Sequence, residues 1–176
     1  VPALNHHLPD DIRVRLSAEV PSDFDSKSSS QSKRYAYRIL RCDTPSAIER
    51  HRAWHIRQDL DLEAMQEASQ HLIGEHDFES FRSVHCDAAH AIRHIHRIDI
   101  DHMEMLAPVP GQLIVLSYHG NAFCRHMIRI LTGTLVEVGR GRFSSQAVAD
   151  MLAARDRREA GLTAPAKGLY LVAVHY

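Results

Sequence analysis

The sequence predicts an α+β protein in which a mostly antiparallel sheet is covered by helices on one face. Segments with strand character come first, and the order helix–strand–strand–helix–helix–strand follows. The two central strands, expected over 91–101 and 113–118, are joined by a turn at 108–111 (PVPG), and so short a connection makes them antiparallel. Each helical segment has an apolar face that has to be buried against a neighbouring layer.

Four other segments are expected to be strands. Residues 12–20 (IRVRLSAEV) alternate apolar and polar side chains, which is typical of a half-buried strand. Residues 35–42 (YAYRILRC) are rich in aromatic and bulky aliphatic side chains, which favour strands. Shorter strands are expected at 53–57 and 169–176. The polar, Ser-rich segment 25–33 (DSKSSSQSK) is expected to be a mobile loop.

Helices are expected where apolar residues recur at intervals of three and four. The first carries one face made of Leu62, Met65, Ser69, Leu72 and Ile73. Asp59 or Asp61 is expected to cap this helix, and Gly74 is expected to end it. A short helical turn is expected over 77–81, and another helix, capped by a serine, over 144–152.

The most informative stretch is 120–139 (GNAFCRHMIRILTGTLVEVG), which predicts a turn running into a helix. Its apolar face consists of Phe123, Met127, Ile130, Leu131, Leu135 and Val138. Arg129 lies inside this apolar stretch, between two isoleucines. Burying its charge without a partner would cost several kcal/mol. Arg129 therefore has to reach solvent along the helix or meet an anion, either a carboxylate or a phosphate.

The composition limits the classes of function. The 176 residues have a formal net charge of -1, so nucleic-acid binding has to come from a local basic patch. Three widely spaced cysteines favour reduced thiols and a cytoplasmic location over a disulfide framework. No apolar run approaches the roughly 20 residues that span a bilayer, so no membrane partner is expected. The fourteen histidines raise the question of metal, but the spacing of Cys86, His90, His94 and His96 fits no common zinc pattern, so no metal site is expected.

The stretch 120–139 strongly resembles the G-N-A-F-x-x-H-M-V-R-x-x-x-G-x-L segment of the TruA-type tRNA pseudouridine synthases. Five further segments match this family in its own order, so that the resemblance covers nearly the whole chain. These are 4–12 (LNHHLPDDI), 33–37 (KRYAY), 74–82 (GEHDFESFR), 163–165 (TAP) and 168–172 (GLYLV).

The resemblance implies a pseudouridine-synthase-like fold and an isomerase that acts on tRNA uridines of the anticodon stem-loop, at tRNA positions thirty-eight to forty. It implies no cofactor, a homodimer and a cytoplasmic location. By this resemblance Arg129 pairs with the nucleophilic aspartate, Tyr35 stacks on the uracil, and Leu169 lines the same pocket. Without the resemblance of 33–37 to the family, Tyr35 would be interpreted as a core aromatic of a strand, because aromatic residues favour strands. The candidate contacts to the RNA backbone are Arg34, Arg82, Arg93 and Arg125.

The sequence departs from the family pattern in two places. No Gly-Arg-Thr-Asp stretch, which carries the family's nucleophile, occurs in it. Residues 1–176 are therefore expected to be the C-terminal catalytic-domain portion of a synthase, inactive alone; the alternatives are a non-catalytic RNA-binding or dimerisation module and, more weakly, a His-rich metal protein. The second departure is 24–30 (FDSKSSS), where the family usually reads F-H-A-R-F-S-A. Here Asp25 is expected to repel phosphate, and Lys27 lacks the bidentate geometry of arginine.

Overall fold

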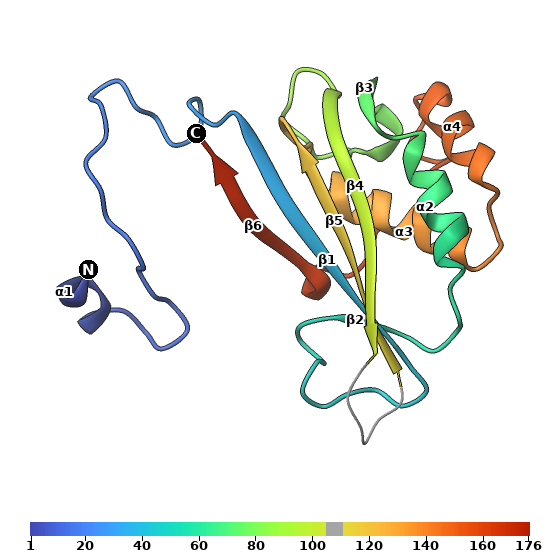
Figure 1. The fold of residues 1–176 in the computed structure, drawn as a ribbon. Helices are drawn as coiled ribbons and strands as arrows, with labels where there is room; N and C mark the ends of the chain where they lie inside the picture. Colours follow the sequence, from blue (N-terminus) through green and yellow to red (C-terminus); the bar gives the residue numbers. More distant parts are fainter. Residues whose placement is uncertain (105–110) are drawn as a thin grey trace. The chain divides into compact units, whose positions relative to one another are not determined.

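The computed structural model of the chain describes residues 1–104 and 111–176. They form two compact units, Val1–Ser30 and Gln31–Tyr176 (Figure 1). The first unit holds one short helix, α1 (Pro2–His6). Its loop is closed by Asn5, whose side chain accepts a hydrogen bond from the amide of Val14 at 2.7 Å and donates one to the Val14 carbonyl at 2.9 Å.

The strand expected over 12–20 is wrong: these residues are irregular, and the apolar side chains of Ile12, Leu16 and Val20 are exposed. The alternating pattern suits a sheet face, but a strand also needs a neighbouring backbone, and no described residue of this unit pairs with it. The segment 25–31 is a loop in which the Asp25 carboxylate accepts hydrogen bonds from the amides of Lys27 and Ser28. Ser32 already belongs to a strand, and the mobility of the loop stays a prediction.

The second unit is built on a six-stranded sheet in the order β2-β1-β5-β4-β3, with β6 also paired to β1. Its strands are β1 (Ser32–Cys42), β2 (Trp54–Ile56), β3 (Gly74–Asp77), β4 (Ile92–Glu104), β5 (Gly111–Gly120) and β6 (Leu169–His175). Every pair is antiparallel except β1 with β2. This confirms the predicted fold class and its two central antiparallel strands, while residues 108–110 of the predicted turn lie outside the described residues.

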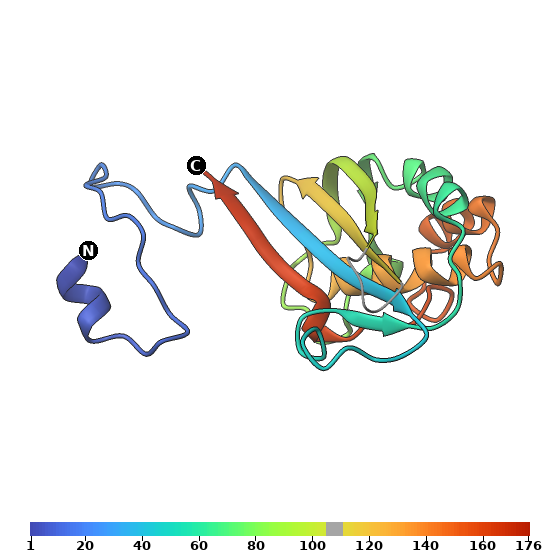
Figure 2. The ribbon, with the colours of Figure 1, turned by 60° about the horizontal axis from the view of Figure 1, so that its bottom comes forward.

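Three helices cover one face of this sheet: α2 (Leu62–Gln70), α3 (Met127–Gly139) and α4 (Ser145–Ala154). Figures 1 and 2 show all three on the same side, with the opposite face of the strands uncovered. Side chains at alternate positions of the strands point to this helical layer, as the pleat requires. Tyr37, Leu116 and Ile98 are among those that are buried there.

Helix α3 is the centre of the core. Twelve of its thirteen residues are buried, and Arg129 is the exception. The hydroxyls of its two threonines are hydrogen-bonded inside the protein. Thr132 bonds the hydroxyl of buried Tyr118 at 2.8 Å and donates to the carbonyl of Ile128, and Thr134 donates to the carbonyl of Ile130 at 2.9 Å. The sequence of α3 is apolar almost throughout because the helix is buried on all sides.

Two glycines allow backbone segments to approach this core closely. A Cβ on Gly133 would lie 1.8 Å from the carbonyl oxygen of Leu162, so the segment 161–164 can cross α3 only because residue 133 has no side chain. A Cβ on Gly168 would lie 2.7 Å from the Arg38 carbonyl oxygen and from the ring of Tyr37. Gly168 ends the short 3₁₀ helix η2 (Ala166–Gly168) and thereby sets where β6 begins.

The end of α2 and the extent of the helical turn after it differ from the sequence predictions, whereas the caps of α2 and α4 agree with them. Asp61 caps α2 by accepting from the amide of Ala64 at 2.9 Å, as predicted, but α2 ends at Gln70. Residues 71–73 continue as tight i→i−3 turns, which often close a helix, and Gly74, at φ +106°, opens β3 instead. The predicted turn over 77–81 contains the 3₁₀ helix η1 (Glu79–Phe81). Ser144 caps α4 as predicted.

Candidate active site

Three residues that are far apart in the sequence border one pocket of about 230 Å³. Tyr35 comes from β1, Arg129 from the first turn of α3, and Leu169 from the start of β6. The rest of the lining comes from the segment 123–128, which leads from the connection after β5 into the first turn of α3. The structure therefore brings together the three side chains to which the family resemblance assigned a shared pocket.

Arg129 is held at one edge of its guanidinium group. Its Nε donates to the carbonyl oxygen of Ala164 at 2.6 Å, and the amide of Ala164 donates back to the Arg129 carbonyl at 3.0 Å. Among the described residues, no carboxylate lies within ion-pair distance of Arg129. A half-buried cation whose terminal nitrogens lack an acidic partner is suited to bind an incoming anion.

The ring of Tyr35 is fixed by an aromatic neighbour. It packs edge-to-face against Phe123, with the ring centroids 5.4 Å apart. Burial raises the pKa of the Tyr35 hydroxyl, so the phenol is neutral at physiological pH. Tyr35 also packs against the margin of the core, which means that its structural and pocket-lining roles coincide. Phe123 was expected on the helix, but it precedes α3 and serves as this ring contact instead.

His126 borders the same pocket, although no sequence pattern singled it out as a site residue. It is the N-cap of α3 and has a left-handed backbone (φ 63°), which is uncommon for a residue with a side chain. Burial, and then the charges of Arg129 and Arg125, lower the pKa of its imidazole. His126 is therefore neutral near pH 7. Its only sequence signal is its place in the H-M step of the stretch 120–139.

Comparison with known proteins shows the family of the chain. Residues 68–176 match the sequence profile described as tRNA pseudouridine synthase. The chain belongs to the tRNA pseudouridine synthase family. Proteins called tRNA pseudouridine synthase A are similar to it over almost its whole length: that of Myxococcus xanthus is 42% identical over 176 residues, 100% of this chain and 64% of the relative. That of Caulobacter vibrioides is 43% identical over 99% of this chain and 68% of the relative, and that of Acetivibrio thermocellus is 39% identical over the same shares.

The chain thus spans about two thirds of the length of these synthases. The family consists of isomerases that modify tRNA. The family match and the names of these relatives confirm the family and the class of reaction that the sequence predicted. No helix in the described part of the chain is long and apolar enough to cross a membrane.

The four arginines expected to contact RNA in this synthase family do not form one cluster. Arg125 borders the Arg129 pocket and donates to the carbonyl of His85 at 3.2 Å. Arg82 forms an ion pair with Glu79 at 2.8 Å and donates a hydrogen bond to the carbonyl of Ala88. Arg93 donates to the carbonyl of Ile92 next to it. These contacts leave Arg125 as the arginine of this group that shares the pocket with Arg129.

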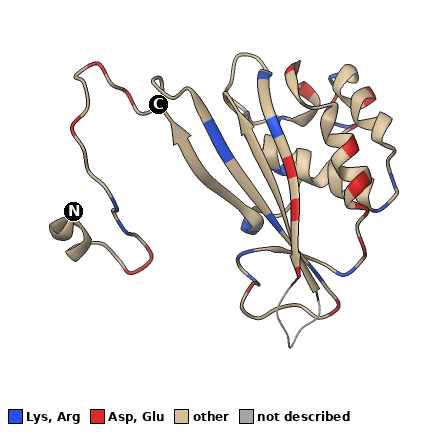
Figure 3. Ribbon diagram, viewed as in Figure 1, with Lys and Arg blue, Asp and Glu red and all other residues tan. Residues whose placement is uncertain are grey.

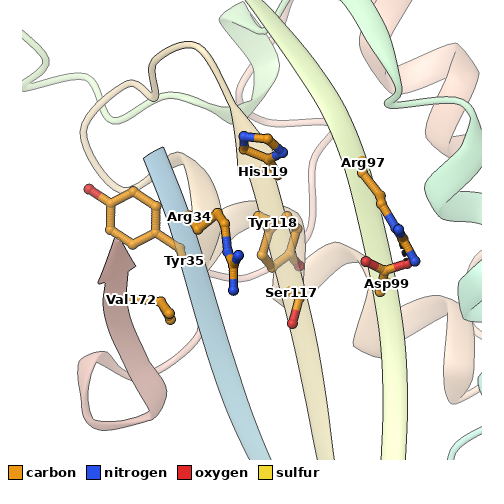
Figure 4. Close-up of a pocket in the computed structure, with 8 residues that line it drawn as sticks. All are labelled: Arg34, Tyr35, Arg97, Asp99, Ser117, Tyr118, His119 and Val172. Atoms are coloured by element: carbon orange, nitrogen blue, oxygen red, sulfur yellow. Dashed lines mark hydrogen bonds and ion pairs between the residues drawn. The ribbon is translucent and has the colours of Figure 1, made fainter. Parts of the chain in front are cut away.

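Arg34 lies elsewhere, on the uncovered face of the sheet. It borders a second pocket, of about 340 Å³, together with Arg97 and His119, whereas Tyr35 borders both pockets. Figure 4 shows the side chains of Arg34 and Tyr35 pointing in different directions from β1, as successive residues of a strand do. Figure 3 shows that β4, which carries Arg97 into this pocket, bears both signs of charge; Arg97 itself is paired with Asp99 at 2.6 Å.

Four of the fourteen histidines form one row on the uncovered face. The rings of His94 and His96 are 4.8 Å apart, His96 and His119 are 4.9 Å apart, and His119 and His175 are 6.0 Å apart. The pKa of His119 is lowered, mainly by burial and then by the charges of His96, His175 and Arg34. Over residues 1–104 and 111–176, no three His, Cys, Asp or Glu side chains converge in a way that could hold a metal ion.

Proposed function

We propose that this chain is the C-terminal catalytic-domain portion of an enzyme that isomerises uridine to pseudouridine in the anticodon stem-loop of tRNA, at positions thirty-eight to forty. The observation that carries the proposal is the meeting of Tyr35, Arg129 and Leu169 at one pocket. These three residues are the ones to which the family resemblance assigned one pocket, and they lie more than 30 positions apart in the sequence. Family membership supplies the reaction class.

The proposed roles follow from the chemistry of each side chain. Arg129, fixed at its Nε, has terminal N–H groups left to hold an aspartate in its ionised form, and a nearby cation lowers the pKa of a carboxylate. The neutral ring of Tyr35 offers a flat surface on which an extruded uracil can stack. Leu169 closes the apolar side of the pocket. The base has to be flipped out of its stack, because the atoms that react are hidden within it.

The nucleophilic aspartate is expected to come from outside these 176 residues. None of the residues that border the pocket is an aspartate or a glutamate. The test is release of tritium from the uracil C5 of labelled tRNA by this chain, compared with a form extended at its N-terminus to the length of its relatives. We expect turnover only from the extended form, and turnover by the 176 residues alone would refute the assignment.

The same experiment separates the two candidate functions. If the extended form binds tRNA but releases no tritium, the chain is part of a non-catalytic RNA-binding or dimerisation module. The proposed partners are tRNA and a second copy of the chain, and the proposed location is the cytoplasm. Sedimentation equilibrium of the extended form tests the homodimer, and a monomer at all concentrations would contradict it.

A further inference from the structure

Two of the three cysteines lie against each other beside the candidate active site. Cys86 is in the loop between η1 and β4, and Cys124 is in the segment between β5 and α3. The amide of Arg125, the residue that follows Cys124, bonds the sulfur of Cys86, and the pKa of each thiol is influenced by the other. Cys124 is buried and borders the pocket of Tyr35 and Arg129, whereas Cys86 is partly exposed.

The loops that carry the two cysteines are joined by their backbones. The amide of Ser83 donates to the carbonyl of Arg125 at 3.0 Å, and the amide of Arg125 donates to the sulfur of Cys86 at 3.4 Å. The Arg125 side chain reaches the carbonyl of His85. These three contacts hold the loop of Cys86 against the residue that follows Cys124 in the sequence.

Hydrogen-bond donors converge on the sulfur of Cys86. Burial of Cys86 opposes its ionisation, but the amides of Ala88 and Arg125, the thiol of Cys124 and the charge of Arg82 together outweigh it. The pKa of Cys86 consequently lies below that of an ordinary cysteine. Burial raises the pKa of Cys124, so the pair consists of one thiolate-prone sulfur and one protonated neighbour.

We propose that Cys86 and Cys124 form a peroxide-reactive dithiol, in which Cys86 is the sulfur that is oxidised and Cys124 is the sulfur that resolves it to a disulfide. This thiol chemistry needs neither bound tRNA nor the proposed synthase activity, so it does not rest on the proposed function. A partly exposed, donor-surrounded sulfur next to a second thiol is the arrangement in which a reversible cytoplasmic disulfide forms.

The reaction balances with hydrogen peroxide as the oxidant. The Cys86 thiolate attacks one peroxide oxygen, the O–O bond breaks, and the departing hydroxide takes a proton to become water, leaving a sulfenic acid on Cys86. The sulfur of Cys124 then attacks that of Cys86 as its own proton is lost, and the S–O bond breaks to release a second water. Two thiols and one peroxide give one disulfide and two waters.

The first test uses the native 176-residue chain and needs no variant. Brief treatment with hydrogen peroxide, blocking of the remaining thiols and digestion without reductant should yield a peptide pair joined through Cys86 and Cys124, which dithiothreitol separates. Cys42 is an internal control, because it is buried and burial raises its pKa. We expect iodoacetamide to modify Cys86 at least roughly 10-fold faster than Cys42 in the folded chain, and equally fast in urea.

Two matched variants assign the roles of the sulfurs. Cys124→Ser should stop at the sulfenic acid, which a dimedone probe labels on Cys86, whereas Cys42→Ser should form the disulfide like the wild type. The proposal is overturned if the folded native chain gives no 86–124 pair, if Cys86 reacts no faster than Cys42, or if oxidation joins Cys86 to Cys86 of another molecule.

Discussion

Replacing Gly133 with alanine should destabilise the second unit by about 2–4 kcal/mol. The new Cβ would lie 1.8 Å from the carbonyl oxygen of Leu162, and no side-chain rotation can relieve a clash with backbone. The segment 161–164 would have to move away from α3. That segment carries Ala164, whose carbonyl holds the Nε of Arg129 at 2.6 Å.

The magnitude is the balance of three effects. Overpacking a tight core costs about 1–3 kcal/mol. Displacing the segment also weakens hydrogen bonds between it and α3, among them the amide of Gly161 to the hydroxyl of Thr134 at 3.0 Å, each worth about 1 kcal/mol. In the opposite direction, alanine is a better helix former than glycine by about 1 kcal/mol. The clash and the lost bonds outweigh the gain in propensity.

Urea denaturation followed by circular dichroism measures the change, and hydrogen exchange at the Ala164 amide, which donates to the Arg129 carbonyl, reports the local displacement. Gly141→Ala is the matched control: a Cβ there meets nothing within 4 Å, so only its positive φ of 71° is penalised, at about 1 kcal/mol. A Gly133→Ala protein within about 0.5 kcal/mol of the wild type, with Ala164 protected as before, would refute the reasoning.

Four other predictions follow from the same structure. Arg129→Lys in the N-terminally extended form should lower pseudouridine formation roughly 10- to 100-fold, because lysine cannot keep the Ala164 bond and also hold a carboxylate at two points; unchanged tritium release would contradict this. Glu137→Gln should cost about 3–5 kcal/mol in urea denaturation, because Glu137 is buried between Arg140 at 2.7 Å and Arg142 at 2.6 Å; a loss below 1 kcal/mol would show that water replaces the pair. Asp25→Asn keeps the acceptor for the Lys27 and Ser28 amides but removes the negative charge, so it should tighten tRNA binding. Arg34→Ala should weaken tRNA binding and lower the slope of log affinity against log salt by about 0.7–0.9. If neither variant differs from the wild type in titrations at several salt concentrations, neither residue belongs to the RNA-binding surface. The pKa of His119 is lowered in the folded state, so as the pH falls the unfolded chain takes up a proton before the folded chain does. The contribution of His119 to the free energy of unfolding is therefore complete above the ordinary histidine pKa and is lost as the pH falls through the lowered one. His119→Gln should flatten the loss of stability between pH 7.5 and 5.5, and parallel pH profiles of the variant and the wild type would exclude that role.

The sequence determined the elements whose signals are local. The strand at 35–42, the capped helix after Asp61 and the buried helix around Arg129 follow from side-chain period, cap residues and turn chemistry, which act over a few residues. The strand expected over 12–20 failed because its alternation needs a partner strand, and partners are a non-local property. The same limit hid β3, which has only four residues and pairs with β4.

For the site, the sequence determined which residues to examine, and the tertiary structure decided which of them meet. Tyr35, Arg129 and Leu169 converge because β1 pairs with β6 and Gly133 lets the segment 161–164 cross α3 to hold the arginine. Arg34 is next to Tyr35 in the sequence but does not border the pocket of Arg129, since successive residues of a strand face opposite sides of a sheet. Contacts such as that between Cys86 and Cys124 depend on how two loops distant in sequence are packed, and the spacing of the residues carries no trace of that packing.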